Sequence, residues 1–256
     1  MHQDLALCWR VEEACKLAWP PLHAQLIDGY VLHMSEANQS RRANSINPLN
    51  GPRGCSDHFI DMVEAMFDHF GKRYCARLPE IANELDIKLA SRGYQREAET
   101  LTLFADQLPP AAAGCDIYVA PGHAPKSWLD FYFSMSKDDQ GQQEAFCRIL
   151  NQIALPKAFG ETRIEGRVAA IAYAVAVDDL VVLEAVVTDP RLRRRGLAQK
   201  TIGGLMAWAA DEGCTQAALQ VVAENEAATN LYAKLGFSTE LYRYHYRVKD
   251  QNAKAS

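Results

Sequence analysis

The sequence predicts an α/β (α+β) protein in which one kind of domain occurs twice. Segments with the two-residue alternation of β-strands interchange with segments whose apolar residues recur at helical spacing. Residues 106–114, which are rich in Pro, Gly and Ala, separate two patterned regions. Gly71 and Gly93 bracket a strand and a helix before a final strand, much as Gly213 and Gly236 do in the second region. A repeat of roughly 100 residues is a duplicated domain rather than a solenoid unit, so we expect domains at 1–108 and 115–250.

Local signals delimit the elements of both regions. Pro20-Pro21 ends the first helix because proline breaks the helical hydrogen-bond pattern. Tyr242, Tyr244 and Tyr246 alternate with basic residues and predict a last strand. The first region is expected to contain a helix (9–18), strands (25–34, 41–48), a helix (57–70), a strand (73–78), a helix (80–92) and a strand (95–104). The second is expected to contain a strand (116–119), a long helical stretch within 126–155, strands (157–164, 167–177, 180–187), a helix (196–212), a strand (216–223), a helix (226–235) and a strand (239–248).

Gly203-Gly204 lies inside the helix predicted over 196–212. Each glycine costs up to about 1 kcal/mol relative to alanine in a helix interior. We interpret the pair as a site where another segment packs closely against the helix.

Composition excludes several classes of protein. The chain has 256 residues, of which 48% are apolar, enough to fill real cores. A net charge of −5 argues against a general nucleic-acid binder, and no apolar run approaches the roughly 20 residues that cross a bilayer. The N-terminus lacks the pattern of a secretion signal. Seven cysteines without a C-x-x-C pair favour reduced thiols over disulfides or zinc, and the seven histidines are scattered. We therefore expect a cytoplasmic protein with no metal, nucleic-acid or membrane partner.

A basic turn followed by small residues joins the apolar segment 180–187 to the helix predicted over 196–212. Pro190 cannot donate to a sheet, so the strand is expected to stop there. Gly196 and Ala198 lack bulk, which leaves the backbone amides of residues 194–199 accessible to a close ligand. These amides begin a helix, where they have no internal partners and lie at the positive end of the helix dipole. The pattern is typical of a pyrophosphate-binding loop. A solvated loop and a nucleic-acid patch are the alternatives.

Two motifs in the second region carry a family resemblance. Arg193-x-x-Gly196-x-Ala198 fits the acyl-CoA signature [Q/R]-x-x-G-x-[G/A]. The second landmark, N-x-x-A-x-x-L-Y-x-x-x-G-F, is matched at every anchor by Asn225, Ala228, Leu231-Tyr232 and Gly236-Phe237. In this order and at this separation, the motifs resemble those of the GCN5-related N-acetyltransferase (GNAT) superfamily.

The first region resembles the front domain of tandem acetyltransferases. The resemblance rests on Trp19-Pro20, on residues 28–30 and on Arg41-Arg42 with the three residues that follow. No R-x-x-G-x-A sequence precedes its long helix, so we expect a degenerate copy. We expect Arg41-Arg42 to serve an interdomain or surface role.

The resemblance implies a fold and a set of cofactor contacts. Each GNAT-like domain would contain a mixed, largely antiparallel sheet flanked by helices, with a central parallel strand pair splayed for acyl-CoA. In the second domain this pair would be 180–187 and 216–223. The main chain of Val186 and Val187 would bind the pantetheine arm, and Asn225 and Asn230 would bind the cofactor near their helix. A helix N-cap role is the alternative for Asn225. The pyrophosphate would contact Arg193, Arg194, Arg195, Gly196, Leu197, Ala198 and Gln199.

Acyl transfer from a thioester to an amine needs a neutral amine, a donor for the oxyanion and a proton for the leaving thiolate. Tyr232 matches the family tyrosine placed beside the sulfur and is expected to be the general acid, although the same spacing suits a core aromatic. The base is open, because Gln220 stands where some relatives have a glutamate. Glu184 is a candidate base or a structural carboxylate, depending on a strand bulge. A water relay from Asp178, Asp179 or Glu224 is the other candidate.

These features predict an N-acetyltransferase that transfers an acetyl group from acetyl-CoA to a primary amine of a small-molecule or amino-acid-like acceptor, by direct attack in a ternary complex. The alternative is a non-catalytic module that binds acetyl-CoA as a sensor or in an interaction. The identity of the acceptor and the oligomeric state carry no motif.

Overall fold

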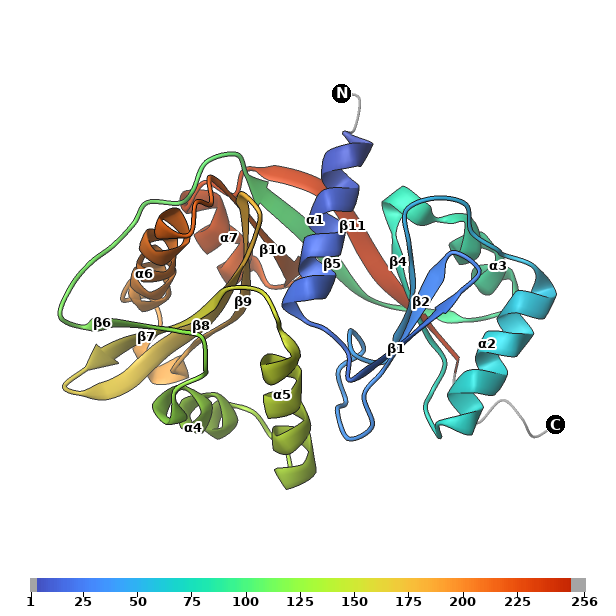
Figure 1. Ribbon diagram of the computed structural model, residues 1–256, viewed down its shortest axis with the longest axis horizontal. Helices are drawn as coiled ribbons and strands as arrows, with labels where there is room; N and C mark the ends of the chain where they lie inside the picture. Colours follow the sequence, from blue (N-terminus) through green and yellow to red (C-terminus); the bar gives the residue numbers. More distant parts are fainter. Residues whose placement is uncertain (1–3, 250–256) are drawn as a thin grey trace.

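A single twisted sheet runs through the whole molecule in the computed structural model, which describes residues 4–249 (Figure 1). Its strand order is β1-β2-β3-β4-β11-β5-β10-β9-β8-β7-β6. The N-terminal half comprises α1 (Leu5–Ala18), β1 (His23–Ile27), β2 (Tyr30–Met34), β3 (Ser45–Pro48), α2 (Asp57–His69), β4 (Cys75–Pro79), the 3₁₀-helix η1 (Glu80–Ala82), α3 (Glu84–Ser91) and β5 (Gln95–Ala105).

The C-terminal half begins with β6 (Ile117–Pro121) and two helices, α4 (Lys126–Met135) and α5 (Gln140–Gln152). It continues through β7 (Lys157–Ile164), β8 (Arg167–Val177), β9 (Leu180–Thr188), the 3₁₀-helix η2 (Pro190–Leu192), α6 (Leu197–Asp211), β10 (Gln216–Val222), α7 (Glu226–Lys234) and β11 (Thr239–Val248). The predicted α/β class is confirmed, and most strands agree with their predicted bounds to within two residues.

Five predicted elements differ from the structure. The helix predicted over 9–18 begins four residues earlier, at Leu5, because the side chain of Asp4 caps it. The strand predicted over 25–34 is the hairpin β1–β2, turned by Asp28-Gly29, whose φ angles are +45° and +80°; such an Asp-Gly pair is a strong turn signal. The strand predicted over 41–48 begins only at Ser45, and the helix predicted over 80–92 starts as the 3₁₀-turn η1. The helical stretch within 126–155 is divided in two, because Asp139 starts α5 with a reciprocal capping box.

The last strand of each half lies in the middle of the sheet. β5 pairs with β10 on one side and with β11 on the other, and β11 pairs in turn with β4. The sheet therefore has no gap where the predicted linker divides the sequence. Residues 1–3 and 250, at the ends of the two predicted domains, lie outside the described residues.

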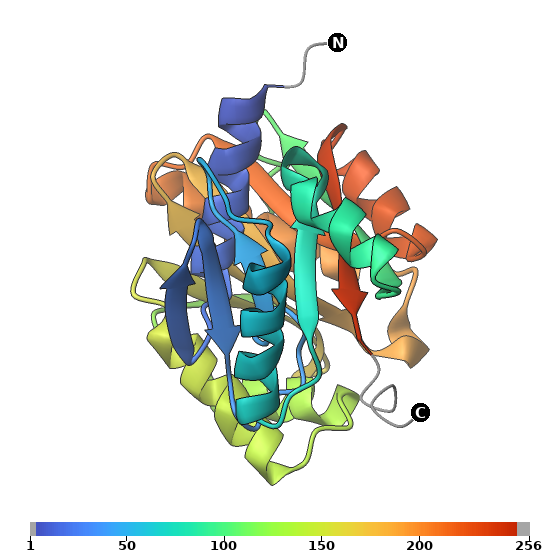
Figure 2. The same ribbon diagram turned by 90° about the vertical axis from the view of Figure 1, so that its right-hand side faces the viewer.

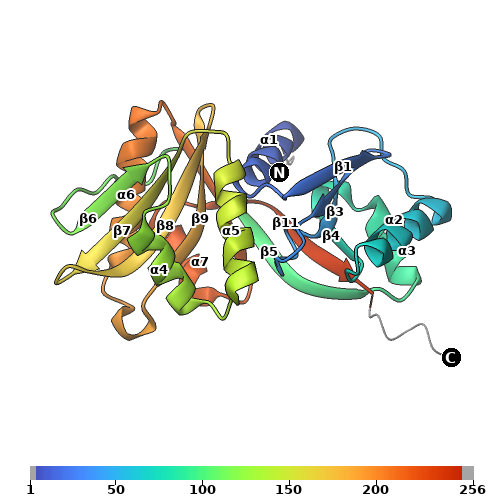
Figure 3. The same cartoon turned by 60° about the horizontal axis from the view of Figure 1, so that its bottom comes forward.

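Helices cover both faces of the sheet (Figures 1 and 3). In the N-terminal half, α2 and α3 pack on β2–β4 and β11, and Figure 2 looks onto α2 and the β1–β2 hairpin. In the C-terminal half, α6 and α7 cover one face. The opposite face carries α4, α5 and also α1, whose Cys8, Val11 and Cys15 join the core formed with β8 and β9. A helix from the first half thus lies directly beside the strands of the second.

Gly203 and Gly204 allow the close approach expected of them. A Cβ atom on Gly203 would lie 2.5 Å from the Cβ of Ala112, and one on Gly204 would lie 2.6 Å from a methyl of Ile117. The predicted linker therefore packs directly on α6, and the glycine pair makes room for it.

Candidate active site

Strands β9 and β10 separate in the middle of the C-terminal half. They pair in parallel from Leu180 and Gln216 as far as Leu183 and Leu219. Beyond this point, no strand among residues 4–249 pairs with the edge of β9 that faces β10. A cavity of about 210 Å³ opens at this fork. It is lined by Leu183, Glu184, Ala185, Val186, Leu219, Gln220, Val221, Val222, Asn225, Ala228 and Tyr232.

A β-bulge shapes the fork. Tyr173 of β8 lies opposite Glu184 and Ile171 lies opposite Val187, so two residues of β9 face the single residue Ala172. The bulged residue Ala185 has a φ of +50°, which is rare outside glycine. The carbonyl of Ala172 accepts a 3.0 Å hydrogen bond from the indole of Trp128. Because a bulge bends its strand, it turns β9 at the residue where pairing with β10 has ended.

The loop after β9 presents backbone amides and positive charge. The Asp189 side chain accepts from the backbone N–H of Arg191 at 2.9 Å and also binds its guanidinium. Arg194 and Gly196 have φ angles of +61° and +73°, and Gly196 is the N-cap of α6 with no side chain to occupy the first-turn amides. Such a terminus attracts anions.

The cationic side chains of this loop remain available. Arg193, Arg194 and Arg195 are exposed. None of the three has an ion-pair partner within residues 4–249. Leu197 is buried against Ala169 and Ala170 and thereby anchors the start of α6, and Ala198 and Gln199 follow it in the first turn. Every residue predicted to hold the pyrophosphate thus lies in one short segment.

Tyr232 lies on α7, is 7% exposed and lines the cavity. Its ring meets Phe237 edge to face at 5.9 Å. Its hydroxyl has no hydrogen-bond partner among residues 4–249. Burial, and secondarily the Glu184 carboxylate, raise the pKa of Tyr232 well above its usual range. The phenol therefore keeps its proton at neutral pH.

The other predicted cofactor residues differ in position. Val186 lines the cavity, whereas Val187 is paired with Ile171 of β8 and is not part of the lining. Asn225 is the N-cap of α7, where its side chain accepts from the N–H of Ala228 at 3.2 Å, and it also lines the cavity. Asn230 is exposed and lies outside the lining.

Comparisons with known proteins agree with this geometry. Residues 8–247 match the model of the family described as "Probable histone acetyltransferase Rv0428c C-terminal". The chain belongs to this family. It is also 23% identical over 246 residues to the uncharacterized N-acetyltransferase YobR of Bacillus subtilis, with 94% of this chain and 98% of that protein covered.

Two solved structures share the fold over nearly the whole chain. A GCN5-related N-acetyltransferase from Kribbella flavida superimposes with a TM-score of 0.70 at 16% identity, covering 99% of this chain and 98% of that one. A tandem GNAT protein from the clavulanic acid biosynthesis pathway gives 0.65 at 9% identity, covering 96% and 89%. The predicted membership of the GNAT superfamily is confirmed, and the chain is a GNAT-type, acetyl-CoA-dependent acetyltransferase.

In this acetyltransferase, the candidate bases lie in different places. Glu184 lines the fork and is 8% exposed, but both its oxygens bind the guanidinium of Arg42. Asp178 and Asp179 form the turn before β9, where Asp179 pairs with Arg10, and Glu224 is exposed. None of these last three lines the cavity.

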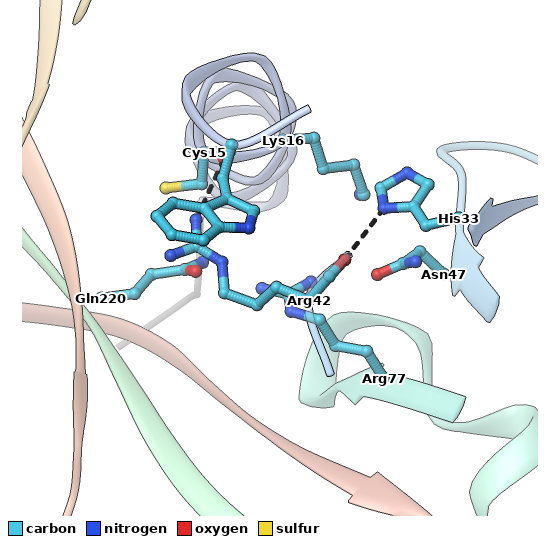
Figure 4. Close-up of a pocket in the computed structure, with 8 residues that line it drawn as sticks. Cys15, Lys16, His33, Arg42, Asn47, Arg77 and Gln220 are labelled. Carbon is cyan, nitrogen blue, oxygen red and sulfur yellow. Dashed lines mark hydrogen bonds between the residues drawn. The ribbon is translucent and has the colours of Figure 1, made fainter. Parts of the chain in front are cut away.

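A second, much smaller pocket of about 10 Å³ lies between the two halves, with room for about one water molecule (Figure 4). It is lined by Cys15, Lys16, Trp19, His33, Arg42, Asn47, Arg77 and Gln220. Gln220 lines the fork as well, so the two spaces share one side chain. The Nδ1–H of His33 donates to the carbonyl of Arg42 at 3.1 Å, and burial lowers the pKa of His33 to about 4, which leaves it neutral.

Sequence reasoning missed the contribution of the N-terminal half to the fork. Arg42 was expected to have an interdomain or surface role, and the structure shows it crossing between the halves, whereas Arg41 binds Glu97 at the surface. The pairing of Arg42 with Glu184 spans 142 residues of sequence. Only the tandem resemblance pointed to the Arg42 segment, and no local pattern links it to Glu184.

All seven cysteines lie within residues 4–249, and none of them is in a disulfide bond. Within the described residues, no group of three or more His, Cys, Asp or Glu side chains is arranged to hold a metal ion. No helix between residues 4 and 249 is long and apolar enough to span a membrane.

Proposed function

We propose that this enzyme transfers the acetyl group of acetyl-CoA to a primary amine of a small-molecule or amino-acid-like acceptor, by direct attack in a ternary complex. One observation carries the proposal. The fork of β9 and β10 opens a cavity that Tyr232 lines, and β9 leads from this fork to the arginine-rich loop and the N-terminus of α6. A thioester in the fork would have its phosphates at the loop and its sulfur near the phenol.

Each predicted residue has a role in this proposal. The unpaired edge of β9 at Val186 and Val187 hydrogen-bonds the pantetheine arm in the manner of an added strand. Residues 193–199 bind the pyrophosphate through their amides and guanidinium groups. Asn225 caps α7 and turns its amide towards the cofactor, and Asn230 contacts the cofactor from the exposed side of the helix.

Protons balance as follows. The neutral amine attacks the thioester carbon, the C–S bond breaks, and the sulfur takes a proton from the hydroxyl of Tyr232. The nitrogen releases one proton to water, and Tyr232 regains one from water. The domain at 115–250 would hold the cofactor, and the domain at 1–108, which lacks the loop, would complete the wall of the fork. Free thiols and the composition support our assignment to the cytoplasm.

Binding of CoA tests the loop. Gly196→Ala forces a Cβ into a left-handed conformation, and Gly213→Ala does the same at the other end of α6, where φ is +88°. A Cβ at either position meets no atom within 4 Å, so both variants lose similar stability, about 1 kcal/mol. We expect calorimetry to show a Kd for CoA at least about tenfold weaker in Gly196→Ala only. Equal affinities in the two variants would contradict the loop assignment.

The acceptor is tested by thiol release from acetyl-CoA. The panel should include amino acids, aliphatic and aromatic amines and a histone-tail peptide. The peptide is included because the family description names a histone acetyltransferase, and a lysine side chain is also a primary amine. Turnover with the peptide but with none of the small amines would contradict the proposed small-molecule acceptor and indicate a peptide acceptor. Tight CoA binding without turnover on any amine would favour the sensor function, which the amide Gln220 at the fork also suits.

A further inference from the structure

The N-terminal half places a charge at the fork. Arg42, in the segment between β2 and β3, donates to the two oxygens of Glu184 at 2.9 and 2.6 Å. The same guanidinium reaches the carbonyl of Cys15 at 3.3 Å and stacks 5.3 Å from the ring centroid of Trp19. The exposed fractions of the two charged side chains are only 21% and 8%. This is a bidentate, charge-assisted pair with little freedom to move.

Glu184 is the first residue of β9 beyond the last pair with β10. A carboxylate offers about four lone-pair positions, and Arg42 uses two of them. Gln220 lines the same cavity, but its Oε1 atom is buried and makes no hydrogen bond within residues 4–249. Its Nε2 atom lies 3.5 Å from the hydroxyl of Thr102. The remaining lone pairs of Glu184 thus supply the hydrogen-bond acceptors at the fork, and an amine supplies the N–H donors that match them.

Arg42 also places a positive charge against both oxygens of Glu184 in a buried position. Burial lowers the pKa of Arg42, but Glu184, with smaller contributions from Tyr244 and Cys15, raises it further, so Arg42 stays charged. Four uncharged titratable groups surround Glu184 from other elements: Cys15 (α1), Tyr132 (α4), Tyr173 (β8) and Tyr232 (α7). Burial raises the pKa of each. Beyond these groups, the charged side chains of Glu12, Lys16 and Arg77 form ion pairs with one another.

We propose that Arg42 is a positioning residue for acetyl transfer: it holds the carboxylate of Glu184 in place at the fork, where this carboxylate accepts a hydrogen bond from the attacking amine. The amine loses its ammonium proton to water before it attacks. Arg42 and Glu184 end the cycle in the state in which they began it. The inference rests on the proposed acetyl transfer, and it assigns part of the acceptor site to the half that lacks the cofactor loop.

The pH dependence of kcat/KM for the amine, at saturating acetyl-CoA, tests this role. In the native enzyme we expect log(kcat/KM) to rise with pH at a slope of one until the pKa of the amine, because the amine must be neutral to attack. In Arg42→Met the buried carboxylate has lost its ion-pair partner, and a buried carboxyl group without a partner favours its neutral form. We expect kcat/KM to fall at least about tenfold, with a slope approaching two at low pH, since two groups must be deprotonated.

Two matched variants separate positioning from folding. Arg42→Lys keeps the charge and should keep the slope of one. Arg41→Met removes the neighbouring arginine, whose partner is Glu97 at the surface, and should leave both the slope and kcat/KM unchanged. Calorimetry with CoA should give the same Kd for every variant. Loss of CoA binding in the native protein would refute the proposed function itself rather than the role of Arg42.

A slope of one in folded Arg42→Met would overturn the proposal, and so would a slope of two in the native enzyme. If Arg42→Met does not fold, Glu184→Gln tests the proposal instead. We expect this variant to have kcat/KM about tenfold lower, mainly through a higher KM, with the slope of one preserved. A fall of about 10² or more that lies mainly in kcat rather than in KM would overturn the proposal and identify Glu184 as the general base.

Discussion

Two buried tyrosine hydroxyls provide a test of the chemistry, because one has a protein partner and the other has none. Tyr232 lines the fork and its hydroxyl makes no hydrogen bond within residues 4–249, whereas the hydroxyl of Tyr242 donates to Glu12 at 2.6 Å. Removing an unpartnered hydroxyl leaves no group unsatisfied, so Tyr232→Phe should change Tm by less than about 2 °C. A general acid contributes about 10²–10⁴ to the rate. We therefore expect kcat to fall by this factor, or about 3–5 kcal/mol of barrier.

Tyr242→Phe should have the opposite effects. It removes a hydrogen bond to a buried carboxylate, worth about 1.5–3 kcal/mol, or roughly 3–12 °C in Tm. The kcat of the folded enzyme should stay unchanged, because Tyr242 does not line the fork. Thiol release measures kcat, and calorimetry with CoA should show the same Kd for both variants. If Tyr232→Phe kept its kcat within about threefold of the native value, the assignment of the proton donor would be refuted.

Two further predictions concern stability. Glu12 is buried with Arg77, Lys16 and Tyr242; burial raises its pKa, but Arg77 and Lys16 lower it further, so that the net shift is downward. Glu12→Gln should lower the free energy of unfolding in urea at pH 7 by about 3–5 kcal/mol. A lowered folded-state pKa contributes stability above the unfolded pKa, so this contribution should decline as pH falls below about 4.5, and a flat acid limb would contradict the buried pair. Burial lowers the pKa of His33 from 6.5 to about 4, so protonation of His33 favours unfolding. The free energy of unfolding of the native protein should therefore fall by up to about 3 kcal/mol as the pH is lowered from 6.5 to 4. His33→Gln should not show this fall. Equal pH dependence in the two proteins would show that His33 is not buried in its neutral form.

The sequence indicated those parts of the site that depend on neighbouring residues. Gly196 had to follow a strand and begin a helix, and both adjacent elements showed clear periodicity. Asn225 and Tyr232 lie seven residues apart on one helix, so their shared cavity follows from helical geometry. The direction of Glu184 depended on a bulge at Ala185, which is an alanine in a conformation usually taken by glycine. No residue type indicates such a bulge, because the surrounding sheet imposes it.

Long-range pairing could not be read from the chain. The period of Tyr242, Tyr244 and Tyr246 predicts a strand but says nothing about its neighbours. In the structure this strand lies between β4 and β5, both of which belong to the other half. Arg42 shows the same limit, because an arginine in a loop has no periodicity and its partner is distant in sequence. The position of β11 and the Arg42–Glu184 pair both depend on contacts between the halves, so each is stabilised only when both halves are folded.

The two halves therefore form one enzyme rather than a working domain with an idle copy. β10, one arm of the fork, has β5 as its other neighbour, so the first half supplies the strand that holds this arm in place. α1 packs on β8 and β9 beside the bulge, and Arg42 neutralises the carboxylate that β9 carries into the cavity. Removing that guanidinium would leave a buried carboxyl group without its ion-pair partner, which costs several kcal/mol. The N-terminal half, which lacks the R-x-x-G-x-A sequence, therefore supplies a strand, a helix and an arginine to the structure around this cavity.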